Sequence, residues 1–91
     1  MPTVWIPSLL QSLTGGASQV VVPGSTVQEV IDQLDARYPG VKARLCEAGQ
    51  IRPHIAVAVN GEVTPEGLRQ PLEEASEVHF LPALSGGREG R

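Results

Sequence analysis

Apolar and polar positions along this chain follow two periods, which predict several strands around one main helix. Five segments show the two-residue period or the β-branched content of strands: 3–7, 19–22, 54–59, 62–64 and 77–82. The glycine-bearing stretch 14–18 predicts a loop that joins the first two strands as a hairpin. Asn60-Gly61 is typical of a type I′ hairpin turn, because both central residues of that turn need a positive φ.

The segment after residue 26 carries the signals of an amphipathic helix. Its apolar residues recur at i, i+3, i+4 and i+7, and they are Val27, Val30, Ile31 and Leu34. Thr26 and Glu29 form a capping-box pattern, in which the Glu29 carboxylate is expected to return to the backbone N–H of Thr26. Pro39-Gly40 ends the helix. A short second helix is expected over 41–48, with Gly49 as its stop.

The resulting order, β-β-α-β-β-β, predicts an α+β fold. We expect a mixed sheet of about five strands packed on one main helix, with the first and last strands parallel at its centre. Residues 1–82 form one domain in this interpretation, and the segment from about Ala83 lies outside the core. No internal repeat or linker divides the chain.

Composition narrows the classes of function. The chain has 91 residues, 41% of them hydrophobic, and a formal charge of −3. This charge argues against nucleic-acid binding, and no apolar run approaches the ~20 residues of a membrane span. Cys46 is the only cysteine, which leaves no disulfide framework and no thiolate metal site. With no signal-like N-terminal segment, we expect a cytoplasmic protein.

The sequence contains no recognisable active site of its own. It lacks a nucleophile–base arrangement, a phosphate-binding glycine loop and a metal-spaced cluster. We interpret His54 and His79 as strand residues at the surface or its boundary, and Cys46 as a packing residue. The protein is therefore expected to have no catalytic residue, to bind no metal or cofactor, and not to be an enzyme.

The pair Gly86-Gly87 follows the last strand, where no return strand needs a turn. By contrast, a loop explains the other pair, Gly15-Gly16, completely. Backbone without Cβ atoms can pass through a narrow channel, and a glycine carboxyl is unhindered for attack on the α-phosphate of ATP. A glycine-rich domain end with no function is the alternative interpretation.

The whole pattern resembles a known family. The residues that carry the resemblance are Gly24 to Val27, Ile55 to Gly61, Pro71-Leu72 with Glu77-Val78, and Phe80 to Gly87. Over essentially the full length to Gly87 they are similar to the ubiquitin-like β-grasp sulfur carriers, the family of the molybdopterin-synthase small subunit and the thiamine sulfur carrier (MoaD/ThiS). The starting stretch Ile6 to Leu10, with Thr14-Gly15-Gly16, looks most like the sulfur carrier of cysteine biosynthesis.

The resemblance implies a route for sulfur. An activating enzyme related to ubiquitin E1 would adenylate the Gly87 carboxyl with ATP, and a sulfur donor would convert it to a thiocarboxylate. A sulfur-accepting synthase, similar to cysteine synthase or to molybdopterin synthase, would then receive the sulfur. By position, Gly86 gives clearance behind the reactive carbonyl. The rest of the tail would lie in the partner's channel: Pro82, Ala83, Leu84 and Ser85.

The chain departs from the family pattern after Gly87. Carriers ready for activation finish at the second glycine, whereas Arg88 to Arg91 follow here. Some relatives carry such extensions, which a zinc metalloprotease of the JAMM type removes. We therefore expect 83–87 to be the working tail and 88–91 to be removed by proteolysis.

Three alternatives remain open at this point. The sulfur could serve molybdopterin or thiamine synthesis, or the activated Gly87 could acylate lysines of target proteins, as a ubiquitin-like modifier does. A β-grasp interaction module without covalent chemistry is the third. In every case a short tail binds weakly by itself, so an adjoining apolar patch is expected, with Trp5 and Leu81 as docking candidates.

Overall fold

The computed structural model describes residues 1–83. Its main helix is α1 (Val27–Arg37), and α2 (Val41–Leu45) follows it. The strands are β1 (Thr3–Trp5), β2 (Gln19–Val21), β3 (Cys46–Glu47), β4 (Gln50–Ile51), β5 (Ile55–Val59), β6 (Glu62–Thr64) and β7 (Glu77–Pro82). Two 3₁₀ turns complete the described chain, η1 (Ser8–Leu10) and η2 (Gly67–Arg69).

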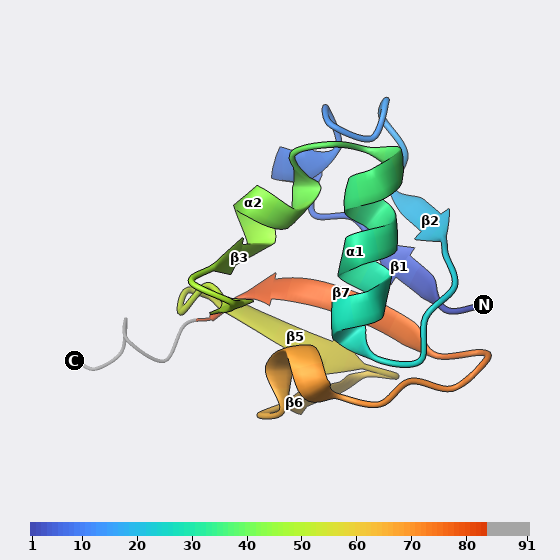
Figure 1. Ribbon diagram of the computed structural model, residues 1–91, viewed down its shortest axis with the longest axis vertical. Helices are drawn as coiled ribbons and strands as arrows, with labels where there is room; N and C mark the ends of the chain where they lie inside the picture. Colours follow the sequence, from blue (N-terminus) through green and yellow to red (C-terminus); the bar gives the residue numbers. More distant parts are fainter. Residues whose placement is uncertain (84–91) are drawn as a thin grey trace.

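Five strands form one mixed sheet in the order β2-β1-β7-β5-β6. The first and last strands pair in parallel at its centre, with Val4 opposite Val78, and both outer pairs are antiparallel. β7 also pairs with β5 along its whole length, from Val78 opposite Val59 to Pro82 opposite Ile55. Figure 1 shows β7 running through the sheet behind α1. This arrangement confirms the predicted α+β architecture.

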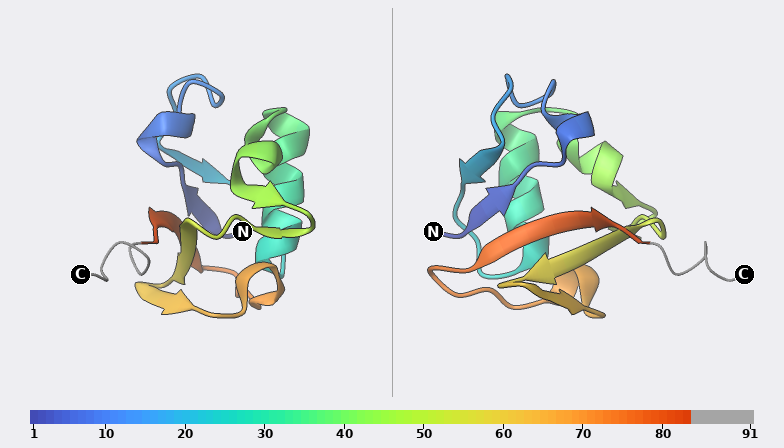
Figure 2. Two further views of the ribbon diagram at one scale, coloured as in Figure 1. Left: turned by 90° about the vertical axis from the view of Figure 1, so that its left-hand side faces the viewer. Right: turned by 180° about the vertical axis from the view of Figure 1, so that it is seen from behind.

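One aliphatic core lies between α1 and the sheet. The four apolar residues of the predicted helical stripe are all fully buried, and so are Val4 and Val78 on the central strands. Each such side chain contributes roughly 1.5–3 kcal/mol through removal from water. Figure 2 (left) shows α1 and α2 on one side of the sheet. The other face of the sheet, seen in Figure 2 (right), is uncovered by any element within residues 1–83.

The cap of α1 differs in one bond from the predicted capping box. The Thr26 hydroxyl accepts from the Glu29 N–H at 3.2 Å, as expected. The Glu29 carboxylate, however, accepts from the backbone N–H and the hydroxyl of Ser25, at 2.8 and 2.9 Å. Thr26 instead lies in a bridge with Pro71, which joins the start of α1 to the segment before β7. Glu29 therefore closes the cap one residue earlier than the pattern indicates.

The predicted second helix over 41–48 is too long. α2 ends at Leu45, and Cys46 to Ile51 form a two-stranded hairpin, β3–β4, around Ala48 and Gly49. Both turn residues have a positive φ, 55° and 76°, so the hairpin needs a left-handed backbone that Gly49 supplies. Gly49 therefore serves as a turn residue and not as a helix stop. The Asn60-Gly61 turn is confirmed, with φ values of 52° and 86°.

Among the helices of the described chain, none has the length and apolar character that crossing a membrane would require.

Gly24 allows the β2–α1 connection to pass close to the helix, which leads to a first prediction. A Cβ at position 24 would lie 2.8 Å from Val30 Cγ2 and 2.9 Å from the Val30 backbone nitrogen, which cannot move without disturbing α1. Gly24→Ala should lower the free energy of unfolding by roughly 2–3 kcal/mol in urea titrations.

Gly49→Ala is the matched control for this prediction, because its backbone φ is also positive but its Cβ would meet nothing within 4 Å. It should cost about 1 kcal/mol, from backbone strain alone. Equal losses for the two variants would show that close approach to α1 is not the reason for Gly24.

The Glu29 cap leads to a second prediction, on pH. Hydrogen bonds from the Ser25 backbone N–H and then the Ser25 hydroxyl lower the pKa of Glu29 below its ordinary 4.5. A lowered pKa in the folded state stabilises the fold above pH 4.5, and this contribution is lost as pH falls through the folded value. Glu29→Gln should therefore be less stable than the natural chain at pH 7, and the difference should shrink below pH 4.5. Urea titrations across this range, with exposed Glu62→Gln as control, measure it.

Candidate functional site

The predicted working segment begins where β7 ends. Pro82 lies opposite Ile55, and the Ala83 N–H donates to the His54 carbonyl at 2.9 Å, so pairing with β5 orients the chain as far as Ala83. The residues predicted to follow it into a partner, Leu84, Ser85, Gly86 and Gly87, lie outside the described residues, and so do Arg88 to Arg91. Their roles stay predictions, and the structure describes the surface from which they start.

A hollow lies beside the last residues of β7, and we call it the tail-root groove. β1 pairs with β7 only from Thr3 to Trp5, after which Pro7 leads the chain away into η1. This departure leaves space between η1, α2 and the end of β7, with a volume of about 450 Å³. The residues that line it are Pro7, Leu9, Leu10, Arg44, Arg52, His54, Ile55, Phe80, Leu81 and Pro82.

The groove combines apolar side chains with cationic ones. Leu9 is 87% exposed and Leu81 is 40% exposed, and the two line the same hollow, so the groove presents apolar surface at one place. The Arg52 guanidinium is held by the Ala43 carbonyl, to which Nε and Nη2 donate at 3.3 and 2.8 Å, and by Glu47 at 3.4 Å. Arg44 forms no side-chain hydrogen bond or ion pair with any residue from 1 to 83. The groove can therefore offer a cation to a partner.

Trp5 and Leu81, the two predicted docking residues, lie on the uncovered face of the sheet. The Trp5 ring stacks on His79 with 5.2 Å between ring centroids and an angle of 9° between the planes. His79 lies opposite Ala58, which in turn lies opposite Val63, so one row of side chains crosses four strands. Ala58 is buried beneath this row, and we call the other residues of this face the open-face patch: Trp5, Val63, His79 and Leu81.

The open-face patch has the composition of a contact surface. Val63 is 65% exposed at the edge strand β6, and Leu81 connects the patch to the tail-root groove. The Trp5 Nε1–H is buried and lacks a hydrogen-bond partner within residues 1–83. The stacking partner of the Trp5 ring belongs to β7.

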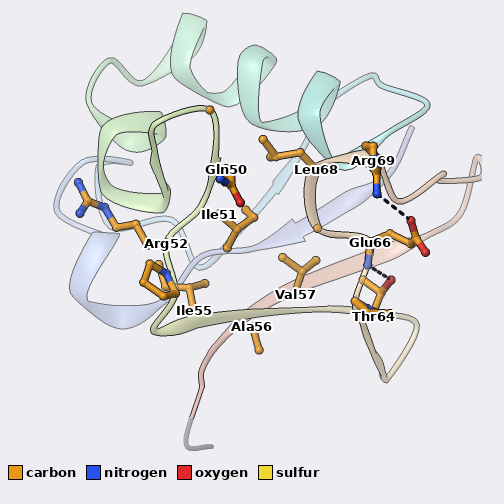
Figure 3. A pocket seen from close by; sticks show the side chains of 14 residues that line it. Gln50, Ile51, Arg52, Ile55, Ala56, Val57, Thr64, Glu66, Leu68 and Arg69 are labelled. Carbon is orange, nitrogen blue, oxygen red and sulfur yellow. Dashed lines mark hydrogen bonds and ion pairs between the residues drawn. The ribbon is translucent and has the colours of Figure 1, made fainter. Parts of the chain in front are cut away.

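A second hollow, of about 580 Å³, opens between the β3–β4 hairpin and η2 (Figure 3). Ile51, Val57 and Leu68 form its apolar part, and the charged Glu66 and Arg69 at its rim pair with each other at 3.8 Å. The Arg52 side chain points away from this hollow, toward α2, where its hydrogen bonds lie. Thr64 and Glu66 both line the hollow, but the Thr64 hydroxyl donates to the Gln70 side chain and accepts from the Glu66 backbone N–H, so the Glu66 carboxylate does not pair with it.

The remaining reactive side chains are dispersed. Burial raises the pKa of the Cys46 thiol above its ordinary value, because desolvation disfavours the thiolate. His54 lies just before β5 and not within a strand as predicted, while His79 faces away from the helix as predicted. Within residues 1–83 no group of three His, Cys, Asp or Glu side chains could hold a metal ion. The described chemistry-bearing groups thus do not form a common site.

The tail-root groove was missed by sequence reasoning. Its one weak signal is Leu9-Leu10 in the short segment between Pro7 and the glycine-bearing loop, where two successive leucines cannot both face the core. In the structure Leu10 is buried and Leu9 is exposed.

Comparison with known proteins gives consistent results. A model of the ThiS family matches residues 4–87. The sulfur carrier protein CysO of Mycobacterium tuberculosis is 34% identical over 90 residues, which cover 93% of this chain and 97% of the relative. Small archaeal modifier protein 3 of Haloferax volcanii is 35% identical over 65 residues, 69% of this chain and 71% of the relative.

Solved structures agree in fold. A chain of the crystal structure of the Amycolatopsis orientalis BexX/CysO complex is 37% identical, and the match covers 96% of this chain and all of that one, with a TM-score of 0.88. The resemblance stated from the motifs is therefore confirmed: this chain has the ubiquitin-like β-grasp fold and belongs to the ThiS family.

Proposed function

We propose that this protein is a sulfur carrier whose reactive group is the main-chain carboxyl of Gly87. The Gly87 carboxylate attacks the α-phosphate of ATP on an E1-like adenylating enzyme and releases pyrophosphate. A sulfide-level sulfur then attacks the acyl carbon, AMP leaves, and a thiocarboxylate remains. A sulfur-accepting synthase takes the sulfur from it. The protein is a co-substrate in both steps, and ATP is used by its activating partner.

One observation carries this proposal: the family match extends from the first strand to residue 87, the second glycine of the tail. It is supported by the course of β7, whose pairing with β5 ends at Pro82 and leaves 83–87 as the segment offered to a partner. It is also supported by the scarcity of other chemistry, since the Cys46 thiol is shifted toward its unreactive form. The sulfur is therefore assigned to the chain's carboxyl group and not to its thiol.

The four residues after Gly87 require a processing step. As long as Arg88 follows, the Gly87 carbonyl belongs to a peptide bond and cannot be adenylated. We assign the removal of 88–91 to a metalloprotease of the JAMM type. The open-face patch, with Trp5 and Leu81, is the proposed docking surface for the partners that then take the tail.

Cysteine biosynthesis is the proposed destination of the sulfur. The similarity to proteins named CysO, and to a CysO chain solved in complex with BexX, supports a carrier that works with a separate enzyme. A cysteine synthase-like acceptor suits this assignment, and a molybdopterin-synthase-like acceptor or thiamine synthesis is the alternative within the same chemistry.

A second candidate function has an observation of its own. The similarity to small archaeal modifier protein 3 favours a role in which activated Gly87 acylates lysines of other proteins. The two functions share the activation step and differ in the nucleophile that then attacks the activated Gly87 carboxyl. This nucleophile is a sulfur donor in one case and a lysine amine in the other.

Intact-mass analysis tests the proposal. A chain ending at Gly87 should gain the mass difference between sulfur and oxygen when incubated with purified E1-like enzyme, ATP and sulfide. The chain that retains 88–91 should gain nothing, because it offers no carboxyl at Gly87. Gly86→Val in the trimmed chain should slow the gain at least tenfold, since its side chain narrows the passage.

Two results would contradict the assignment. Equal sulfur uptake by the untrimmed chain would exclude Gly87 as the reactive group. Adducts on lysines of cell proteins, without any thiocarboxylate, would favour the modifier function.

A further inference from the structure

We propose that the tail-root groove is a docking site for the activating enzyme, and that this partner fills it with an apolar side chain flanked by carboxylates. The inference rests on the proposed function and adds the chemistry of the partner surface that recognises the carrier. It concerns a surface separate from the open-face patch, with which it shares only Leu81.

Because the tail is short, a partner that holds Gly87 must lie next to this groove. Residues 83–87, fully extended, span at most about 18 Å. An enzyme whose active site takes up Gly87 must therefore cover the surface from which the tail starts. Pro82 and Leu81 line the groove, and Ala83 is still hydrogen-bonded to His54 beside it. The groove is thus inside the contact area of any partner that holds the tail.

The apolar part of the groove is built for contact. Leu9 lies on η1 almost fully exposed, while its neighbour Leu10 is buried and anchors the turn in the core. The exposed side chain is consequently held on a fixed 3₁₀ turn and not on a loose loop. Together with Leu81 and Phe80 it forms a depression large enough for one or two apolar side chains.

The charged side chains of the groove indicate which charge the partner's contact surface carries. The protein as a whole has a formal charge of −3, yet the residues that line this groove in the described chain include Arg44, Arg52 and His54 and no Asp or Glu. Glu47 offsets Arg52 from outside the groove, at 3.4 Å. Arg44 has no such counter-charge within residues 1–83, so its guanidinium can pair with a partner's carboxylate.

Two substitutions test this on the trimmed chain with purified E1-like enzyme. Arg44→Glu and Leu9→Ser alter exposed side chains, so the fold should be preserved. The rate of ATP-dependent adenylation is measured against carrier concentration. Each variant should raise KM about tenfold or more with little change in kcat, because the tail that reacts is unchanged. The effect of Arg44→Glu should weaken at high salt, since salt screens exposed charges.

Matched controls separate the groove from general effects. Arg69→Glu makes the same change in net charge on η2, away from the groove, and Val21→Ser removes an exposed apolar side chain from the edge strand β2. Both should leave KM within about twofold of the natural chain.

Several outcomes would overturn the inference. If the natural chain is adenylated normally and KM is unchanged in Arg44→Glu and Leu9→Ser, the groove is not the docking site for the activating enzyme. This outcome would leave the proposed carrier function intact. A lower KM in these variants would indicate that the chain's own tail occupies the groove. A dimer of the natural chain that the two substitutions dissociate in sedimentation experiments would assign the groove to a second copy. Failure of the natural chain to be adenylated would refute both proposals.

Discussion

The structure depends on the parallel pairing of β1 with β7. These strands come from opposite ends of the described chain, and their contact places Val4 beside Val78 under α1. Everything between them is arranged around this pair: β2 is added to one side, β5 and β6 to the other, and α1 covers the apolar face. Parallel neighbours need a long connection, and here the connection includes the main helix and the remaining strands of the sheet.

The same pairing decides where the tail begins. β7 lies at the centre of the sheet, but β1 accompanies it only as far as His79. From Phe80 onward β7 is paired with β5 alone, and its last residues leave the domain beside a space that β1 has vacated. A strand held on one side is still firmly oriented. The segment that follows therefore starts from a defined point and direction, which suits the proposed entry of the tail into a partner's active site.

The two surfaces proposed for docking meet at this point and differ in chemistry. The open-face patch is broad and apolar, with the Trp5–His79 stack at its centre, while the tail-root groove is smaller and carries uncompensated positive charge. Leu81 belongs to both: alternation along β7 places it on the open face, opposite to the buried Phe80, and it also lines the groove. A carrier that is charged by one enzyme and discharged by another has to be recognised twice. A scaffold with two surfaces around one tail root can meet this need.

Much of the fold was predictable from sequence because its signals are local. The stripe from Val27 to Leu34, the Thr26 cap and the Asn60-Gly61 turn each depend on residues within one or two turns of chain, and the structure has them as predicted. The β3–β4 hairpin was missed because its strands have two residues each, too few for a period to be visible. The Glu29 bond to Ser25 was missed because Ser25 and Val27 are hydrogen-bonded to the distant segment 70–72, which no local pattern in the cap indicates.

The sequence by itself determined the aliphatic core, the main helix, the five strands of the sheet and the glycine tail, since these follow from the order of side chains along the chain. Only tertiary structure decided that Leu9, Arg44, His54 and Leu81 would surround one groove. These residues come from a 3₁₀ turn, a short helix, a loop and the last strand, and no spacing relates them. They meet because β1 turns away from β7 after Trp5, and such a departure is a property of packing that no local pattern records.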